Sequence, residues 1–302
     1  MSNTFPFKSL YSIQGVLLGP FVSVSLMLFL LGFYVLLFGL VVYFLCVCQT
    51  SAKRRLHLWW TTMLFVLSFS LAVLNAAEQI NTTVLGFQAV TTQDFDALIN
   101  WVTVDSDANK ALEIVPTILY LLANCIADMI LVYRCFVLWE SMRHIFIVAI
   151  VVLFSTNAIG FAGFVIAFLD FITEIPEALS QKATVMSTGY FIANAINTFL
   201  LTLTIAGRIW WLSRESQKYM GHEVDQRYKR VIAMVIESGF LYSTSQVVYV
   251  SVKESISRLG YVLDMSLLVV LMVGIAPTLI ILCSSLGLTE SAVPDSQMIS
   301  TL

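Results

Sequence analysis

Long stretches of apolar residues dominate this sequence and constrain its fold more than any other feature. A lipid bilayer offers the backbone no hydrogen-bond partners, so a stretch of about 20 apolar residues crosses it as a helix. The sequence therefore predicts an all-α polytopic membrane protein, a single seven-helix bundle over residues 1–302. The predicted spans are 21–47, 58–80, 112–139, 145–171, 185–211, 231–252 and 261–283. Residues 284–302, which contain no Lys or Arg, are predicted to form a disordered cytosolic tail.

The composition excludes several classes of protein. Of the 302 residues, 59% are hydrophobic and 12% are charged, whereas a soluble domain carries roughly 25% charged residues. These values exclude a soluble globular domain, a disordered chain and a nucleic-acid-binding protein. The expected partner of the chain is the lipid bilayer, and no nucleic acid is expected to bind.

Basic residues in the short loops predict the orientation, because Lys and Arg favour the cytosolic side. Eleven of them fall in one set of loops and five in the other. This places the N-terminus outside and the C-terminus in the cytosol, with the plasma membrane as the expected location. The sequence Asn81-Thr82-Thr83 then lies on the outer side, where Asn81 is a candidate glycosylation site.

Two carboxyl groups fall within the predicted spans, Asp128 in the third and Glu237 in the sixth. Each lies about 9–10 Å from the cytosolic boundary, and an ionised group there costs roughly 2.5–3.5 kcal/mol. We expect the two carboxyls to face each other, with at least one protonated at pH 7 and bridging the two helices. Two alternatives stay open. Each carboxyl would bond to a neighbouring hydroxyl or amide, or an ionised Glu237 would pair with Arg134 or Arg208.

Polar residues also recur at helical spacing in the third, fifth and sixth spans, and such stripes face the bundle rather than lipid. They would either line a ligand cavity or hold the helices together, and the sequence leaves both open. Asn75 and Glu78, near the outer end of the second span, favour a pocket that faces outward. The candidate intramembrane network consists of Asp128, Glu237, Asn124, Asn194, Asn197, Tyr242 and Gln246.

Two further candidate features would serve signalling. Basic residues beside Trp210 and Trp211 would form a cytosolic coupling face, or would anchor the chain to anionic lipid headgroups. Pro277 leaves one backbone carbonyl without its donor and adjoins Gly274, so the seventh span would bend there as a hinge. The residues of the candidate coupling face are Arg134, Arg208, Arg214, Lys218, Arg227, Lys229 and Arg230.

No motif for catalysis, phosphate binding or metal binding occurs. The sequence lacks His-Glu-x-x-His, Gly-x-Ser-x-Gly, P-loop and Cys-x-x-Cys patterns. All three His residues, His57, His144 and His222, fall in predicted cytosolic loops. We therefore expect no metal, no cofactor and no enzymatic activity.

Four segments together resemble a known family: Tyr133–Trp139, Ala206–Trp211, Glu237–Ser243 and Gly274–Ile281. The chain is similar to a large seven-helix membrane-protein family expanded in mushroom-forming basidiomycete fungi. The likeness runs from the third span to the end of the seventh, about half of the chain. It implies a seven-helix fold and a membrane location, and no particular ligand or reaction.

A receptor-like sensor is the expected function. An extracellular ligand would favour one arrangement of the last three spans, and the change would reach a signalling partner through the cytosolic 208–230 loop. The alternative is a transporter or lipid-handling protein that uses Asp128 or Glu237.

Overall fold

The computed structural model describes residues 13–48, 52–92, 107–138, 143–173, 177–220, 222–259 and 264–289. Almost all of them are helical, which confirms the all-α class. The helices in these ranges are α2 (Ile13–Cys48), α3 (Ala52–Thr92), α5 (Asp107–Leu138), α6 (Arg143–Thr173), α7 (Glu177–Met220), α8 (His222–Leu259) and α9 (Ser266–Thr289).

Five of these helices are long and apolar enough to cross a membrane, namely α2, α3, α5, α6 and α7. The apolar part of α9 is shorter, Ser266–Leu282, and α8 is the most polar of the helices. The length and composition of these helices are those of a helical multi-pass membrane protein.

Each predicted span has a helix at its centre, but the helices extend beyond the apolar stretches. The residues that extend α7 and α8 include Arg, Glu, Gln and Lys, which are good helix formers, so these helices need not end where the apolar run ends. The Asn, Thr, Ser and Gly residues that extend α3 and α9 are poor helix formers, and propensity does not explain those extensions. The segment 208–230 was expected to be a loop, yet α7 continues to Met220 and α8 begins at His222. Likewise α9 continues to Thr289, so the expected disordered tail begins as helix. The remainder of that tail, 290–302, lies outside the described residues.

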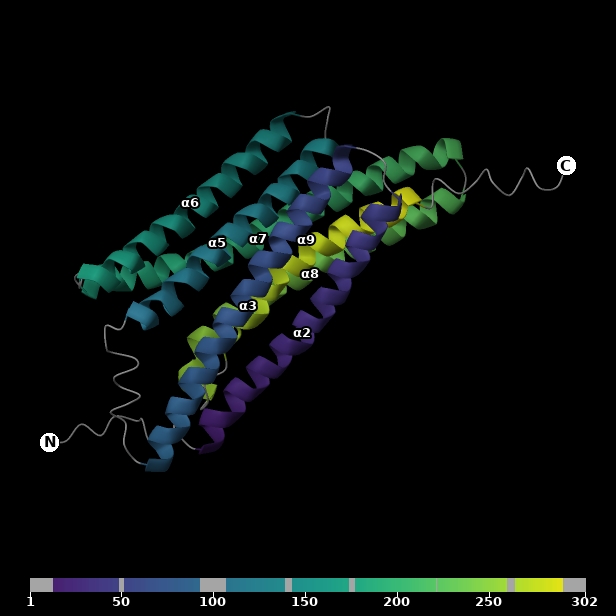
Figure 1. Ribbon diagram of the computed structural model, residues 1–302. Helices are drawn as coiled ribbons and strands as arrows, with labels where there is room; N and C mark the ends of the chain where they lie inside the picture. Colours follow the sequence, from purple (N-terminus) through teal and green to yellow (C-terminus); the bar gives the residue numbers. More distant parts are fainter. Residues whose placement is uncertain are drawn as a thin grey trace.

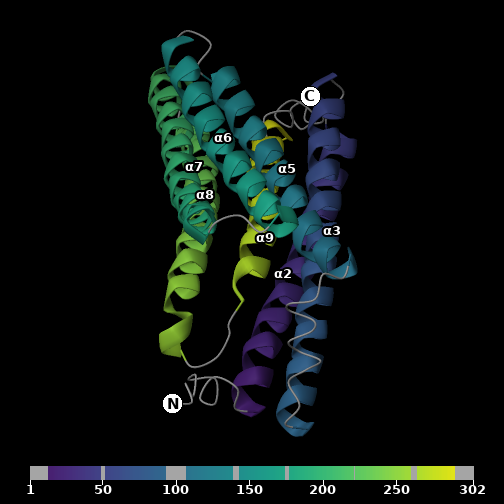
Figure 2. The same ribbon diagram turned by 90° about the vertical axis from the view of Figure 1, so that its left-hand side faces the viewer.

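The helices run alongside one another as an elongated bundle (Figure 1). Figure 2 shows α7 and α8 side by side at one edge, α2 and α3 at the other, and α9 between them. Helix α6 packs on α7 and α5. The last helix thus contacts α2, α3, α5 and α8 and forms the centre of the bundle.

Burial agrees with this arrangement. Helices α2 and α6 expose large apolar side chains, including Phe29 at 73% and Phe154 at 76%, as expected of surfaces that contact lipid. Most described side chains of α9 are buried. Helix α8 is polar on its buried side, with Ser238 and Gln246, and apolar on its exposed side, with Phe240. This inverted pattern explains how a polar helix belongs in an apolar bundle.

Candidate functional site

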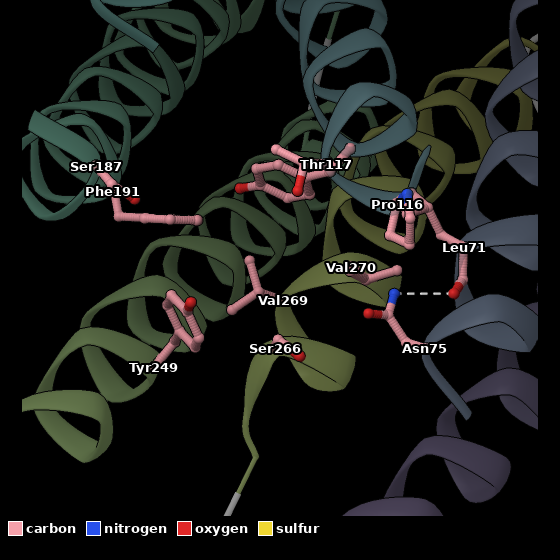
Figure 3. Close-up of a pocket in the computed structure, with 11 residues that line it drawn as sticks. Leu71, Asn75, Pro116, Thr117, Ser187, Phe191, Tyr249, Ser266, Val269 and Val270 are labelled. Atoms are coloured by element: carbon pink, nitrogen blue, oxygen red, sulfur yellow. Dashed lines mark hydrogen bonds between the residues drawn. The ribbon is translucent and has the colours of Figure 1, made fainter. Parts of the chain in front are cut away.

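A partly open cavity of about 190 Å³ lies between α3, α5, α7, α8 and α9 (Figure 3). It lies toward the end of the bundle where α5, α7 and α9 begin, which we call the pocket end. Its lining is uncharged and mixes apolar side chains with hydroxyls and one amide. The lining residues are Leu71, Asn75, Pro116, Thr117, Tyr120, Ser187, Phe191, Tyr249, Ser266, Val269 and Val270.

Aromatic rings from three helices form one wall of this pocket. Phe191 of α7 lies between Tyr120 of α5, with ring centroids 5.6 Å apart, and Tyr249 of α8, with centroids 4.9 Å apart. Across the pocket, Asn75 donates its amide hydrogen to the carbonyl of Leu71 at 2.9 Å, which orients its side chain (Figure 3). Asn75 lines this pocket, as expected, whereas Glu78 does not line it.

Beneath the pocket, Asn124 is the centre of a fully buried hydrogen-bond network. Its Nδ2 donates to the hydroxyl of Tyr190 at 2.9 Å, and its Oδ1 accepts from Asn194 Nδ2 at 2.9 Å. The same Oδ1 accepts from the Tyr242 hydroxyl at 2.6 Å. Three helices, α5, α7 and α8, are thus joined through one side chain. The four-residue spacing of Tyr120, Asn124 and Asp128 places them on one face of α5, so the pocket and the network are continuous along that helix.

Asp128 ends this polar column and is 4% exposed. Its Oδ2 accepts from Asn157 Nδ2 of α6 at 2.8 Å and from Asn124 Nδ2 at 3.3 Å. Both donors are neutral amides, as in the alternative of a carboxyl bonded to a neighbouring amide. The polar stripes of the sequence did not single out Asn157. Its signal was the one amide in the run Ser155-Thr156-Asn157 in the middle of an apolar span, where an unsatisfied polar group is costly.

The expected pair of Asp128 and Glu237 is wrong. Glu237 is exposed on the outer surface of α8, whereas Asp128 is buried among amides from α5 and α6. The rotation of α8 turns Glu237 away from the interior. Neighbouring Ser238, at 1% exposed, faces the bundle instead.

The other two network candidates are close to the column but bonded differently. Asn197 donates to the Thr156 hydroxyl and so joins α7 to α6. Gln246 is 0% exposed and does not line the cavity. Its side chain lies within reach of the Tyr120 hydroxyl, which is buried and also lies near Tyr242.

The candidate coupling residues lie far along the helices from the pocket. Arg134 Nη1 donates to the carbonyl of Ile280 at 2.8 Å, so it ties α5 to α9. Arg208 lies over the ring of Trp211 at 4.4 Å, and Arg214 over Trp210 at 5.0 Å. Such cation–π contacts suit a chain that anchors at a membrane interface. The side chains of Lys218, Arg227, Lys229 and Arg230 lie outside the described residues, although their backbone is helical.

The candidate hinge residues, Gly274 and Pro277, lie where α9 packs closely against α2 and α3. Helix α9 continues through Pro277, and the Thr278 hydroxyl donates to the carbonyl of Gly274 at 2.7 Å. A Cβ on Gly274 would lie 2.6 Å from both Ser68 Oγ and Tyr34 Oη. The glycine therefore allows α9 to approach α2 and α3 closely, and its hydrogen atom faces their hydroxyls.

Asn81 is exposed, but it lies within α3 rather than in the expected outer loop. Thr83, two residues on, donates its hydroxyl to the Gln79 carbonyl within the same helix. A continuous helix presents the acceptor sequence less readily than an extended loop does. Within the described residues, no three His, Cys, Asp or Glu side chains come together as metal ligands.

No protein-family model, curated protein or solved structure matches the chain.

Proposed function

We propose that the protein is a receptor-like sensor of the plasma membrane with seven spans, an outer N-terminus and a cytosolic C-terminus. In this orientation the pocket end faces outward and admits an extracellular ligand. The paired ends of α7 and α8 reach into the cytosol and contact a signalling partner. The proposal includes no catalytic step.

The observation that carries the proposal is the position of the pocket directly above the Asn124 network. A ligand between α3, α5, α7, α8 and α9 would contact Tyr120 and Tyr249. Tyr120 lies one helical turn from Asn124, which joins α5, α7 and α8. A ligand with different affinities for two arrangements of these helices would shift the population between them.

A transporter that uses Asp128 is the second candidate, because this buried carboxyl lies at the foot of the same polar column. Transporter sites are commonly formed by broken helices near the midplane. Helices α3, α5, α7 and α8 continue past the pocket, and α5 continues past Asp128, without a break. A transporter would move a labelled substrate into proteoliposomes, whereas a sensor would bind it without net uptake.

Cysteine labelling in intact cells tests the orientation on which the proposal depends. A membrane-impermeant maleimide should label Ser187→Cys, in the pocket, and should label Lys218→Cys only after permeabilisation. Wild-type protein gives the background from the native cysteines. Labelling of Lys218→Cys from outside would reverse the topology and remove the sensor proposal.

Signalling itself needs a second measurement in the same cells. Expressed protein would be screened against small molecules with an intracellular readout, in parallel with a variant whose pocket is filled, Ser187→Phe. A response present in the wild type and lost in Ser187→Phe is the expected result. Responses that survive in this variant would show that the pocket is not the sensing site.

A further inference from the structure

The exposed face of α7 changes from apolar to basic at two tryptophans, Trp210 and Trp211. The apolar stretch of this helix, Gln181–Trp211, ends at the second of them. Both rings are about half exposed, Trp210 at 51% and Trp211 at 50%. Tryptophans at the end of an apolar span lie at the level of the lipid headgroups. The headgroups are therefore the part of the lipid that this end of α7 contacts.

An arginine lies over each of these rings. The guanidinium carbon of Arg208 is 4.4 Å from the centre of the Trp211 ring, and that of Arg214 is 5.0 Å from the centre of the Trp210 ring. Arg208 thus extends toward the C-terminal end of α7 and Arg214 toward its N-terminal end. Both cations come to the level of the two indoles, one on each side of them.

This arrangement suits a phosphate group. The face of an indole attracts a guanidinium and holds it in place. Stacking leaves the N–H edge of a guanidinium available for bidentate bonds to phosphate oxygens. Arg208 and Arg214 therefore flank a position where a phosphate-containing headgroup would be bound in front of the tryptophans.

One turn earlier on the same face, Gly207 leaves space for an acyl chain. Residues 200, 203, 207, 210 and 214 recur at helical spacing and so form one stripe along α7. Leu200 and Leu203 are exposed. Among the described residues, nothing lies within 4 Å of a Cβ added at Gly207. The glycine is a gap in the row of side chains, and an acyl chain that extends from the headgroup position would pass over it along the two leucines.

We infer that this face of α7 binds one anionic phospholipid. The headgroup lies against Trp210 and Trp211 between the two arginines, and one acyl chain passes over Gly207. The occupant is a lipid rather than a soluble anion because the stripe continues as an apolar face. It is anionic rather than zwitterionic because two cations flank the headgroup and would repel a choline.

Two lipids with the same acyl chains test the charge requirement on the purified protein in detergent. Native mass spectrometry would follow titrations with phosphatidylglycerol and with phosphatidylcholine. We expect the first phosphatidylglycerol to bind at least about fivefold more tightly than the first phosphatidylcholine. Glycerophosphoglycerol, which has the same headgroup and no acyl chains, should not compete. Equal binding of the two lipids, or competition by the soluble headgroup, would overturn the inference.

Arginine substitutions locate the headgroup. The double variant Arg208→Gln, Arg214→Gln should lose the preference for phosphatidylglycerol. The control is Arg55→Gln, which removes an exposed arginine in the first turn of α3, at the same end of the bundle. This control should keep the preference. A preference that survives in the double variant, or that both variants lose equally, would place the anionic lipid elsewhere and overturn the inference.

Glycine substitutions locate the acyl chain. Gly207→Leu fills the gap, whereas Gly189→Leu adds the same side chain five turns earlier on the same face, where the added Cβ again has no neighbour within 4 Å in the described part of the chain. Leu is the better helix former, so both variants should fold. We expect the affinity for phosphatidylglycerol to fall at least about fivefold in Gly207→Leu and to stay unchanged in Gly189→Leu. Equal affinities would show that no chain passes over Gly207 and would overturn the inference. These measurements in detergent do not depend on the orientation of the chain or on the sensor proposal.

Discussion

Two sides of the bundle differ in one respect: a network of buried amides joins the helices of one side, whereas glycines pack closely on both. On the side of α5, α6, α7 and α8, hydrogen bonds between side chains join the helices, with Asn124 at the centre. Close-packed glycines also lie on this side, Gly160 against Tyr190 and Gly239 against Thr202. On the side of α2, α3 and α9, Gly274 packs closely against Tyr34 and Ser68. The stacked rings of Phe38 and Phe65, 4.2 Å apart, continue this packed interface.

The difference teaches where this molecule tolerates change. A close-packed contact has one arrangement, because interiors are dense and any added atom must displace another. A network of amides and hydroxyls has several donors and acceptors within reach of one another and can exchange partners. The pocket lies between the two sides, with Leu71 and Asn75 from one and Phe191 and Tyr249 from the other. A ligand there would contact both the side with the amide network and the opposite side.

The largest expected loss of stability comes from a substitution at Gly274, on the side of α2, α3 and α9. Gly274→Ala places a methyl group 2.6 Å from Tyr34 Oη and Ser68 Oγ, and overpacking of this kind costs about 1–3 kcal/mol. Thermal unfolding in detergent measures the loss. The control is Gly32→Ala on α2, where nothing lies within 4 Å of the added atom. That control should melt at or slightly above the wild type, because Ala is the better helix former. Identical melting of the two variants would contradict the steric contact.

A smaller loss of stability is expected from a substitution in the Asn124 network, on the side of α5, α6, α7 and α8. Tyr242→Phe removes the hydroxyl that donates to Asn124 Oδ1 at 2.6 Å and accepts from Asn194 Nδ2 at 3.1 Å. Hydrogen bonds between membrane helices are worth about 0.6 kcal/mol on average and up to about 1.7, so we expect a loss of about 1 kcal/mol.

The same chemical change at an exposed position is the control. Tyr43→Phe alters a side chain that is 61% exposed on α2, and it should leave the unfolding temperature unchanged. Circular dichroism of the two purified variants gives both values. If both tyrosines behave alike, the network contributes nothing to stability and the contrast between the two sides fails.

The sequence predicted the helices well and their ends poorly, for a physical reason. Apolar length reports the part of a helix that lies in lipid, and each predicted span has a helix at its centre. It says nothing about where backbone hydrogen bonding stops, so the ends of α3, α7 and α9 were misplaced. The polar stripes correctly placed Asn124, Asn194 and Tyr242 in the interior, because their four-residue spacing defines a face. The approach of Tyr120 to Tyr242 and Gln246 depends on how α5 and α8 pack together, which no spacing reveals.

The position of Glu237 around its helix is visible in the sequence, although its depth alone suggested an interior partner. Its positions i+3 and i+4 are Phe240 and Leu241, and i+11 is Val248, all apolar and all exposed. The face that contains Ser238 and Tyr242, by contrast, is buried. Helical periodicity therefore places Glu237 on the lipid side of α8. Depth along a helix cannot distinguish its two faces, whereas the periodicity of the neighbouring residues can.

The smallest expected effect follows from that position. Glu237 is exposed and Asp128 is buried, so Glu237→Gln and Glu237→Leu should each change stability by no more than about 0.5 kcal/mol.

The buried carboxyl provides the matched comparison. Asp128→Leu removes the acceptor that Asn157 Nδ2 bonds at 2.8 Å. The same Nδ2 keeps its bond to the Leu153 carbonyl, but one of its two hydrogens loses its partner in a dry site, so the loss should be clearly larger. Thermal unfolding of the three variants in one detergent decides the matter. A loss above about 1 kcal/mol for Glu237→Leu would mean that this carboxyl has an interior partner after all. The buried polar network would then extend to the face of α8 that contains Glu237. The comparison between the two sides of the bundle would have to include that contact.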